Sequence, residues 1–347
     1  LGDSLLELKK LKDHSVDMVF CDPPYNLQLS KTLYRPDATK VSGVNDDWDK
    51  FKSFQDYDFF TKTWLSEIKR ILKPDGCLWV IGSYHNIYRI GSILQDLGFW
   101  ILNDIIWRKT NPMPNFRGTR FTNAHETLIW CGKNSSTKGY TFNYDSMKSL
   151  NEGLQMRSDW LLPLCTGAER LKRNGHKAHP TQKPESLISR VILSTSKPGD
   201  LIVDPFSGSG TTAAVAKRFS RQFIGIEQSK EYVKISRQRL QTVQVLNDPD
   251  VLEIETKRNA PRVPFGSLLD RGLVNPGELM FDARRRWHAK IRADGLLISE
   301  RLKGSIHAVG AAVQGAQACN GWTFWQVDRD GRANSVSYTH LTLPTKA

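Results

Sequence analysis

Two stretches of the chain repeat one pattern, in which an apolar run, an amphipathic helical segment and a second apolar run follow one another. In the first stretch the apolar runs are VDMVFCD (16–22) and CLWVIG (77–82), and SFQDYDFFTKTWLSEIKRIL (53–72) between them has apolar residues at helical spacing. The turn signature Lys-Pro-Asp-Gly at 73–76 is expected to end that helix. Short apolar runs bounded by turns are typical of buried parallel strands, so this stretch predicts a strand–helix–strand unit.

The second stretch lies within residues 183–240. A helix is expected to end at KPGD (197–200), a strand to cover 201–203, a helix to follow at about 211–219, and QFIGIE (222–227) to form the last strand. Two such units predict a doubly wound, Rossmann-like α/β sheet. Three segments between the units add a predicted helix and two predicted strands, in the order NIYRIGSILQDLG, WILNDIIWRK and ETLIWCG.

Changes in composition along the chain predict its domains. We expect an α/β domain over 1–243, a polar segment with recognition loops at 110–178 within it, a linker at 244–262, a small basic C-terminal α+β domain at 263–335 and a tail at 336–347. In the C-terminal domain, ARRRWHAKIRADGLLI predicts a β-hairpin around its Ala-Asp-Gly turn. The tail lacks a core pattern and resembles translated adapter sequence, so it is set aside.

Composition narrows the class of protein. The chain is 39% hydrophobic and 24% charged, as in soluble globular proteins, and no apolar run is long enough for a membrane span. The 5 cysteines are widely spaced without a C-x-x-C pair, which argues against a disulfide framework or a zinc site. The opening LGDSLLELKK has no initiator Met and no signal-peptide pattern. We therefore expect a cytoplasmic protein with reduced thiols and no metal.

Positive charge is concentrated in one part of the chain. Residues 1–256 hold 35 basic and 29 acidic side chains, whereas residues 257–303 alone hold 11 and 5. A dense basic segment indicates a polyanion partner, most simply nucleic acid, because neutralising phosphates releases counterions. A solvated basic surface is the alternative, and charge alone does not separate the two.

A glycine-rich turn follows the predicted strand at 201–203. In DPFSGSGTTA (204–213) two glycines stand where a ligand could approach the backbone and the start of the next helix. Gly208-x-Gly210-x-x-Ala213 also satisfies the dinucleotide fingerprint, and Glu227 could bind a ribose diol in either case. A glycine-rich turn that binds nothing is a third interpretation.

A second motif, DPPY (22–25), follows the predicted strand at 16–22. Two adjacent prolines remove two backbone donors and end any strand that reaches them. Taken alone, the motif is compatible with a simple turn.

The two motifs together resemble the S-adenosylmethionine-dependent amino-methylating DNA methyltransferases. GDSLLEL and DPPY come first, HPTQKP (179–184) follows the polar segment and DPFSGSGTT comes last, which is the circularly permuted order of the β group of that family. IGSYHNIYRIG, NDIIWRKTNPMPNFRGTRFTNAHETLIW, YTFNY and QMRSDWL resemble the alphaproteobacterial cell-cycle-regulated adenine methyltransferases, which act at GANTC and carry a similar C-terminal extension. Ser207 departs from the usual second Phe, and the strand expected before Gly2 is absent, which leaves the predicted sheet incomplete.

This resemblance implies S-adenosylmethionine as the cofactor and assigns residues to it. Phe206, Gly208 and Gly210 line its methionine and sugar, with Thr211 and Thr212 at the helix start. Glu227 holds the ribose hydroxyls, Asp3 lies near the adenine, and Thr181 and Lys183 meet the carboxylate end. Asp204 is expected to orient the loop, and His179 to stabilise a turn rather than to carry a proton.

The catalytic residues implied are Asp22, Pro23, Pro24 and Tyr25. The lone pair of the adenine amino nitrogen is delocalised into the ring, so a carboxylate on Asp22 and a backbone carbonyl near Pro23 are needed to accept its hydrogens and free that lone pair. Tyr25 supplies a stacking face for a base taken out of the duplex.

DNA contacts are expected from two regions. In the polar segment they involve basic side chains that suit guanine edges and phosphates: Arg117, Arg120, Lys138, Arg157, Lys172 and Arg173. In the C-terminal segment, cations stand beside aromatics that could stack on displaced bases: Arg284, Arg285, Arg286, Trp287, Lys290, Arg292, Trp322, Phe324 and Trp325. Core packing is favoured for Trp322 and Phe324, whose alternation fits a half-buried strand, and DNA contact for the arginines.

The main hypothesis is an adenine-specific methyltransferase without a cognate endonuclease, acting on double-stranded DNA and located at the nucleoid through its substrate. A homodimer is compatible with the sequence. A non-catalytic DNA-binding module and an amino-methyltransferase of RNA or cytosine remain alternatives.

Overall fold

The computed structural model describes residues 1–27, 49–115, 118–173, 175–246, 264–300, 302–329 and 332–336. The chain divides into two compact units, Leu1–Asn259 (unit 1) and Ala260–Ala347 (unit 2). The expected linker at 244–262 and tail at 336–347 fall almost wholly outside the described residues.

Unit 1 is built on a mixed sheet of 7 strands in the order β5-β3-β4-β2-β1-β8-β9. The strands are β1 (Val16–Cys21), β2 (Leu72–Gly82), β3 (Trp100–Lys109), β4 (His125–Gly132), β5 (Asp159–Leu162), β8 (Leu201–Asp204) and β9 (Gln222–Gly225). Neighbouring strands are parallel except at β4, which is antiparallel to both β2 and β3. A separate two-stranded ribbon is formed by β6 (Lys172–Arg173) and β7 (His176–Lys177).

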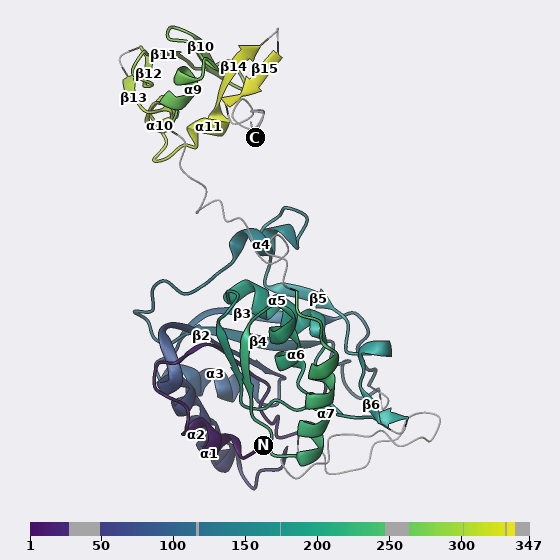
Figure 1. Ribbon diagram of the computed structural model, residues 1–347. Helices are drawn as coiled ribbons and strands as arrows, with labels where there is room; N and C mark the ends of the chain where they lie inside the picture. The colour runs from purple at the N-terminus through teal and green to yellow at the C-terminus, as the bar shows by residue number, and fades with distance from the viewer. Residues whose placement is uncertain are drawn as a thin grey trace. The chain divides into compact units, whose positions relative to one another are not determined.

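Helices cover both faces of this sheet, as Figure 1 shows. The described helices of unit 1 are α1 (Ser4–Leu8), α2 (Phe54–Ile71), α3 (Ile87–Asp96), α4 (Tyr144–Ser149), α5 (Glu185–Thr195), α6 (Thr211–Arg218) and α7 (Lys230–Thr242), of which α4 contacts α5 and does not cover the sheet. The first three pack on one face around Trp64 and Leu65, and α5 and α6 pack on the other around Val191 and Val215. The predicted doubly wound α/β fold is confirmed.

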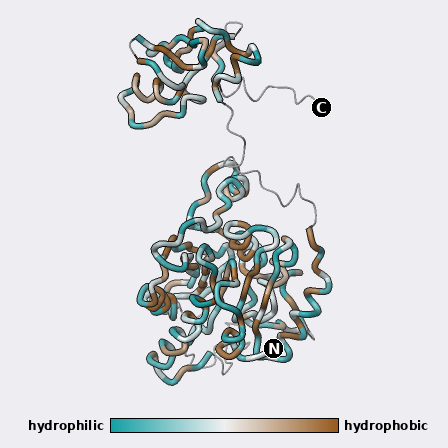
Figure 2. The backbone as a smooth tube through the Cα atoms, turned by 60° about the vertical axis from the view of Figure 1, so that its left-hand side comes forward, coloured by the Kyte–Doolittle hydropathy of each residue, from teal (hydrophilic) through white to brown (hydrophobic). Residues whose placement is uncertain are grey.

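Two apolar layers hold the helices to the sheet because side chains alternate between its faces. Along β1, Val19 and Cys21 join the α1–α3 layer, whereas Met18 and Phe20 join the α5–α6 layer. Figure 2 shows the corresponding hydrophobic stretches running through the interior of unit 1. In the second layer Trp79 stacks on its cross-strand neighbour Trp130, with ring centroids 5.6 Å apart.

The segment 73–76 does not separate the helix from the next strand. The chain passes directly from α2 into β2 at Leu72. Val16 pairs with Leu72 but Met18 pairs with Cys77, so the Lys-Pro-Asp-Gly residues form a bulge in β2. The expected turn is therefore accommodated inside the ladder.

The polar segment 110–178 is not an insertion outside the sheet. It contains β5 at one edge and β4 near the centre, between β2 and β3. Residues 110–124, which join β3 to β4, form the connection of an antiparallel hairpin. Recognition loops predicted for this segment are consequently anchored in the core sheet.

Unit 2 contains a six-stranded antiparallel sheet in the order β13-β12-β11-β10-β14-β15. Its elements are α9 (Gly266–Asp270), β10 (Leu279–Asp282), β11 (His288–Ile291), β12 (Leu297–Ser299), β13 (Leu302–Gly304), α10 (Ile306–Gln314), α11 (Gly321–Phe324), β14 (Trp325–Arg329) and β15 (Arg332–Ser335). The predicted hairpin is confirmed, since Ile291 pairs with Leu297 around the Ala-Asp-Gly turn.

Trp325 is not available for DNA, contrary to the sequence-based expectation. It is the first residue of β14, its side chain is fully buried, and its indole N–H donates to the Ile306 carbonyl at 3.0 Å. Trp322 and Phe324 lie in the helical turn α11 rather than in a strand, and both pack against the same core. The alternating aromatics end a helix and begin a strand, so local alternation was misleading here.

None of the helices in the described ranges is long and apolar enough to cross a membrane.

Replacing Trp325 with Ala should destabilise unit 2 by about 3–5 kcal/mol, because it removes a fully buried aromatic and leaves a cavity. Urea unfolding of the full chain measures the effect. Leu279→Ala, at a side chain that is 46% exposed in the same sheet, is the control and should cost about 0.5 kcal/mol. Equal losses for the two variants would contradict the core assignment.

Candidate functional site

The two predicted motifs meet at one edge of the sheet. Met18 and Val19 of β1 pair in parallel with Ile202 and Val203 of β8. Parallel strands end on the same side, so the loop beginning at Asp22 and the loop beginning at Pro205 lie next to each other. Between them is a cavity of about 310 Å³.

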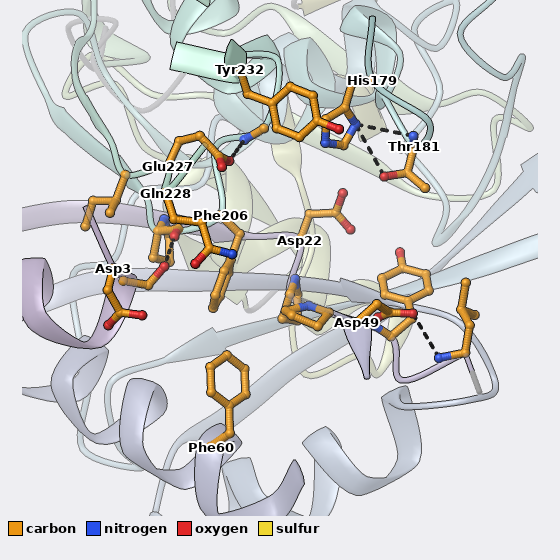
Figure 3. A pocket seen from close by; sticks show the side chains of 18 of the residues that line it. Asp3, Asp22, Asp49, Phe60, His179, Thr181, Phe206, Glu227, Gln228 and Tyr232 are labelled. Carbon is orange, nitrogen blue, oxygen red and sulfur yellow. Dashed lines mark hydrogen bonds between the residues drawn. The ribbon is translucent and has the colours of Figure 1, made fainter. Parts of the chain in front are cut away.

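Most residues predicted for the site line this cavity (Figure 3). They are Asp3, Asp22, Pro23, Pro24, Tyr25, Thr181, Lys183, Phe206, Gly208 and Glu227. The sequence did not predict the other lining residues, which are Ser4, Leu27, Asp49, Lys50, Phe51, Phe60, Pro205, Ile226, Gln228 and Tyr232. His179 was expected only to stabilise a turn, but it also lines the cavity.

Four residues predicted to bind the cofactor lie behind the cavity wall instead: Asp204, Gly210, Thr211 and Thr212. Asp204 Oδ1 accepts from the Phe206 amide at 3.0 Å, and Thr211 Oγ1 accepts from Arg239 at 2.9 Å. Gly210 is the N-cap residue of α6 at φ 75°, and a Cβ there would come within 2.0 Å of Ser236 Oγ. These residues build the loop and do not line the cavity, and the cofactor contacts expected of Gly210, Thr211 and Thr212 stay a prediction.

Glu227 follows β9 and fixes the glycine-rich loop. Its carboxylate accepts from the amides of Gly208 and Ser229, at 2.9 Å and 2.8 Å. Burial raises its pKa, and these amide hydrogen bonds oppose that rise. A carboxylate has about four acceptor sites, so Glu227 keeps capacity for ligand hydroxyls. Phe60 and Phe206, with ring centroids 6.1 Å apart, form an apolar wall beside it.

Asp22 forms an ion pair with Lys183, whose Nζ lies 2.9 Å from Oδ1 and 2.8 Å from Oδ2. Burial raises the pKa of Asp22, and Lys183 opposes this rise. For Lys183, burial lowers the pKa, but Asp22 and Glu126 outweigh it and raise the value overall. Lys183 therefore pairs with Asp22, the predicted catalytic residue. It also lines the cavity, where it was expected to contact the carboxylate of the cofactor.

The Tyr25 side chain is fixed by Glu126 and Lys183. Its hydroxyl donates to Glu126 Oε2 at 3.0 Å, and Lys183 Nζ lies 5.1 Å from the ring centroid. Glu126 also pairs with Lys109 at 2.9 Å. Burial, followed by the charges of Asp22 and Glu126, raises the pKa of Tyr25. Glu126 was missed in the sequence because nothing in HETLIWCG marks its one acid as different from a surface residue.

The backbone after Asp22 is fixed by two side chains distant in sequence. Tyr57 donates to the Pro24 carbonyl at 2.8 Å, so this acceptor is already engaged. Asp49 accepts from three consecutive amides, those of Tyr25, Asn26 and Leu27, at 2.6, 2.8 and 3.0 Å. The loop is thus rigid on both sides of Tyr25.

His179 lies against the glycine-rich loop and behaves as a neutral packing group. Its ring centroid is 4.5 Å from that of Tyr232, and a Cβ on Gly208 would come within 3.0 Å of its Nε2. Burial, with Lys183 and Arg170 nearby, lowers its pKa to about 4. Its Nδ1 accepts from the Thr181 amide at 3.3 Å, which fits the turn-stabilising interpretation.

The basic side chains of the polar segment that were predicted for DNA binding and that the structure describes are exposed and lie outside the cavity. Arg120 donates to the Tyr84 hydroxyl at 3.2 Å, and Arg157 pairs with Asp159 at 2.8 Å. Arg117 lies outside the described residues, as does the side chain of Arg173. Lys138 and Lys172 are exposed.

In unit 2, Arg284, Arg285 and Arg286 are exposed and lie at the start of the hairpin. The guanidinium of Arg285 lies 4.1 Å from the Phe281 ring centroid and that of Arg286 lies 4.0 Å from that of Trp287. Asp328 and Asp282 pair with these two arginines at 3.2 Å and 3.3 Å. No group of three or more His, Cys, Asp or Glu side chains in the described part of either unit could hold a metal ion.

A family model described as DNA methylase matches residues 16–238, which include both motifs and every sheet strand of unit 1. The chain is a member of the DNA methylase family. A second model, Restriction Enzyme Adenine Methylase Associated, matches residues 248–343.

Relatives of this DNA methylase span most of its length. Type II methyltransferase M.HinfI of Haemophilus influenzae is 47% identical over 331 residues, covering 95% of this chain and 91% of the relative. Type II methyltransferase M2.DpnII of Streptococcus pneumoniae is 46% identical over 240 residues, covering 69% and 88%.

Solved structures resemble unit 1. The crystal structure of the M1.HpyAVI-SAM complex has 29% identity and a TM-score of 0.51, covering 69% of this chain and 96% of that one. The PvuII DNA methyltransferase (cytosine-N4-specific) has 24% identity and a TM-score of 0.53, covering 69% and 84%, and supports the fold alone.

Asp204→Asn tests the buried carboxyl behind the loop. Burial raises the pKa of Asp204 to about 7, against about 3.9 for an unfolded chain. The folded state therefore keeps the proton longer, and stability from this group is full below about pH 4 and lost as the pH rises to about 7. Relative to the wild type, the Asn variant should gain roughly 4 kcal/mol between pH 4 and 8 in urea unfolding. Parallel stability curves would contradict this assignment.

Proposed function

We propose that this DNA methylase transfers a methyl group from S-adenosylmethionine to the exocyclic amino nitrogen of adenine in double-stranded DNA, at GANTC. The observation that carries the proposal is the position of Asp22 and Tyr25 in the same cavity as Glu227 and the glycine-rich loop. One cavity thus offers acceptors for an amino group, a stacking face for a base and an acceptor for ribose hydroxyls.

The residues present fit the cofactor. Glu227 has acceptor sites beyond those taken by its two amides, and Asp3 engages the amides of Leu5 and Leu6 with Oδ1, which leaves Oδ2 for a ligand donor. Phe60, Phe206 and Ile226 supply apolar walls, and Gly208 has no Cβ to fill the space. When bound, S-adenosylmethionine supplies an electrophilic methyl group on a sulfonium.

Asp22 and the backbone prepare the target nitrogen. A free lone pair on an Asp22 oxygen accepts one amino hydrogen, since Lys183 occupies only part of that carboxylate. Tyr57 already engages the Pro24 carbonyl, which favours the Pro23 carbonyl as the second acceptor. With both hydrogens held, the nitrogen lone pair would be free to accept a methyl group, and the Asp22 carboxylate would accept the proton that the nitrogen then loses. Tyr25, fixed by Glu126 and Asp49, stacks on the extruded base.

Adenine rather than cytosine as the target is supported by Asp22 in the DPPY motif, since the related enzymes that methylate the cytosine amino group more usually have a Ser at this position. GANTC, and a cell-cycle role without a cognate endonuclease, are supported by the strings around NDIIWRKTNPMPNFRGTRFTNAHETLIW. DNA binding by unit 2 is supported by its exposed arginines on aromatic faces.

Methyl transfer from labelled S-adenosylmethionine to GANTC duplexes should fall about 100- to 1000-fold in Asp22→Ala, because the amino group loses its charged acceptor. Cofactor binding, measured as thermal stabilisation, should survive in Asp22→Ala and be lost in Glu227→Ala. Duplexes altered at each position test the site, and nucleoside analysis identifies the base. Undiminished transfer in Asp22→Ala, or methylated cytosine as the product, would overturn the proposal.

Changing Arg284, Arg285 and Arg286 together to Ala should weaken DNA binding and reduce the slope of log K against log salt by about 2.7, if each arginine neutralises one phosphate. The matched control changes three exposed lysines of unit 1, Lys9, Lys10 and Lys12, to Ala. An identical slope in the arginine variant and the wild type would show that this run is a solvated surface.

A further inference from the structure

Glu126 lies outside the cavity and contacts the residues that form its base-binding wall. Its side chain is 12% exposed and is not among the residues that line the cavity. It accepts from the Tyr25 hydroxyl at 3.0 Å, and Lys183 Nζ lies 3.7 Å away. One carboxylate thus touches both the stacking aromatic and the cation that pairs with Asp22.

The same carboxylate marks the base of the loop predicted to recognise DNA. Glu126 lies opposite Trp107 in the β3–β4 hairpin, and its partner Lys109 is the last residue of β3. The Lys109 amide donates to the Ala124 carbonyl at 2.8 Å, which closes the hairpin directly below residues 110–124. Arg120 is carried by this loop. Glu126 therefore lies where this loop joins the sheet.

The charges in this cluster balance one another. Asp22 and Glu126 are negative, and Lys183 and Lys109, whose side chains are 10% and 8% exposed, are positive. Buried charges remain only where they are paired, so each member constrains the position of the next. Lys183 is shared between two carboxylates, and a change at Glu126 redistributes its interaction with Asp22.

We propose that Glu126 is a positioning residue that fixes Tyr25 and the Asp22–Lys183 pair and couples them to the recognition loop at 110–124. This inference rests on the proposed function, since it assigns how target recognition reaches the groups that hold the adenine. Glu126 touches neither the base nor the cofactor and acts through Tyr25 and Lys183.

The charge of Glu126 has a measurable effect on Asp22. Charged or titratable groups facing Asp22 are Lys183 from the segment before α5, Glu126 from β4, Tyr25 from its own loop, Asp204 at the end of β8 and Cys21 at the end of β1. Burial raises the pKa of Asp22, Lys183 lowers it, and Glu126 raises it further. Loss of Glu126 and loss of Lys183 should therefore shift this pKa in opposite directions.

The first experiment is a single-turnover methylation rate measured against pH. Glu126→Gln should move the acidic limb of the profile to lower pH, and Lys183→Met should move it to higher pH, because Asp22 must be ionised to accept the amino hydrogen. Above the limb, Glu126→Gln should be about 10- to 100-fold slower, because its neutral amide oxygen accepts more weakly from Tyr25 and no longer pairs with Lys109 and Lys183. Lys183→Arg keeps the charge, so its acidic limb should lie at the same pH as in the wild type. This variant is the substitute if Lys183→Met does not fold.

Two controls match these variants away from the site. Glu67→Gln removes a partly buried carboxylate paired with Arg70, and Lys133→Met removes a buried lysine bonded to the Leu72 carbonyl. Neither should move the limb. The inference would be overturned if the acidic limb lay at the same pH in Glu126→Gln and in the wild type, or if Glu126→Gln and Lys183→Met shifted it in the same direction.

The second experiment is a double-mutant cycle. If Glu126 acts through the Tyr25 hydroxyl, Glu126→Gln in a Tyr25→Phe background should cost far less than in the wild type. Glu126→Asp keeps the charge but shortens the side chain, so it should lose rate and keep the wild-type limb. Independent, additive effects would overturn the positioning role. No methylation by wild-type protein would instead refute the proposed function, so the two failures are distinguishable.

Discussion

The parallel pairing of β1 with β8 is the constraint on which the site depends. Asp22 and Pro205 are far apart in sequence, yet each directly follows one of these two strands. The shared direction brings both loops to the same edge of the sheet, and the cavity forms between them. Phe206, Gly208 and Glu227, proposed for the cofactor, follow β8 and β9, whereas Asp22 and Tyr25, proposed for the base, follow β1.

Rigidity is then added by groups that never enter the chemistry. Asp49 binds three successive amides around Tyr25, Tyr57 binds the Pro24 carbonyl, and Asp204 binds the Phe206 amide. Each satisfies a backbone group that would otherwise need water, and so stabilises the loop conformation described. The cost is a set of buried carboxyl groups whose pKa values lie above their ordinary range.

How much of this follows from the sequence depends on whether the signal is local. Apolar runs and turn residues are local, and they predicted every strand of the large unit 1 sheet except β5. The two motifs and the segments between them pointed to about half of the residues that line the cavity. Glu126 and Asp49 carry no such signal, because their roles come from contacts with Tyr25, which is 101 and 24 residues away. Trp325 shows the reverse failure: the alternation of Trp322 and Phe324 suggested a half-buried strand and left Trp325 as a candidate for DNA contact, whereas the packing of unit 2 places Trp325 in the core at the start of β14.

The antiparallel strand β4 has one more consequence. Because β4 is antiparallel to β2 and β3, it begins at the edge of the sheet where β2 ends. The β4 end of the 110–124 loop therefore lies at the same edge of the sheet as the cavity. The two ends of this loop are joined by the Lys109–Glu126 ion pair and by the hydrogen bond from the Lys109 amide to the Ala124 carbonyl. A surface loop whose ends are fixed in this way tolerates changes of length and sequence. The hairpin thus allows the proposed recognition loop to change in sequence while the proposed catalytic residues keep their positions.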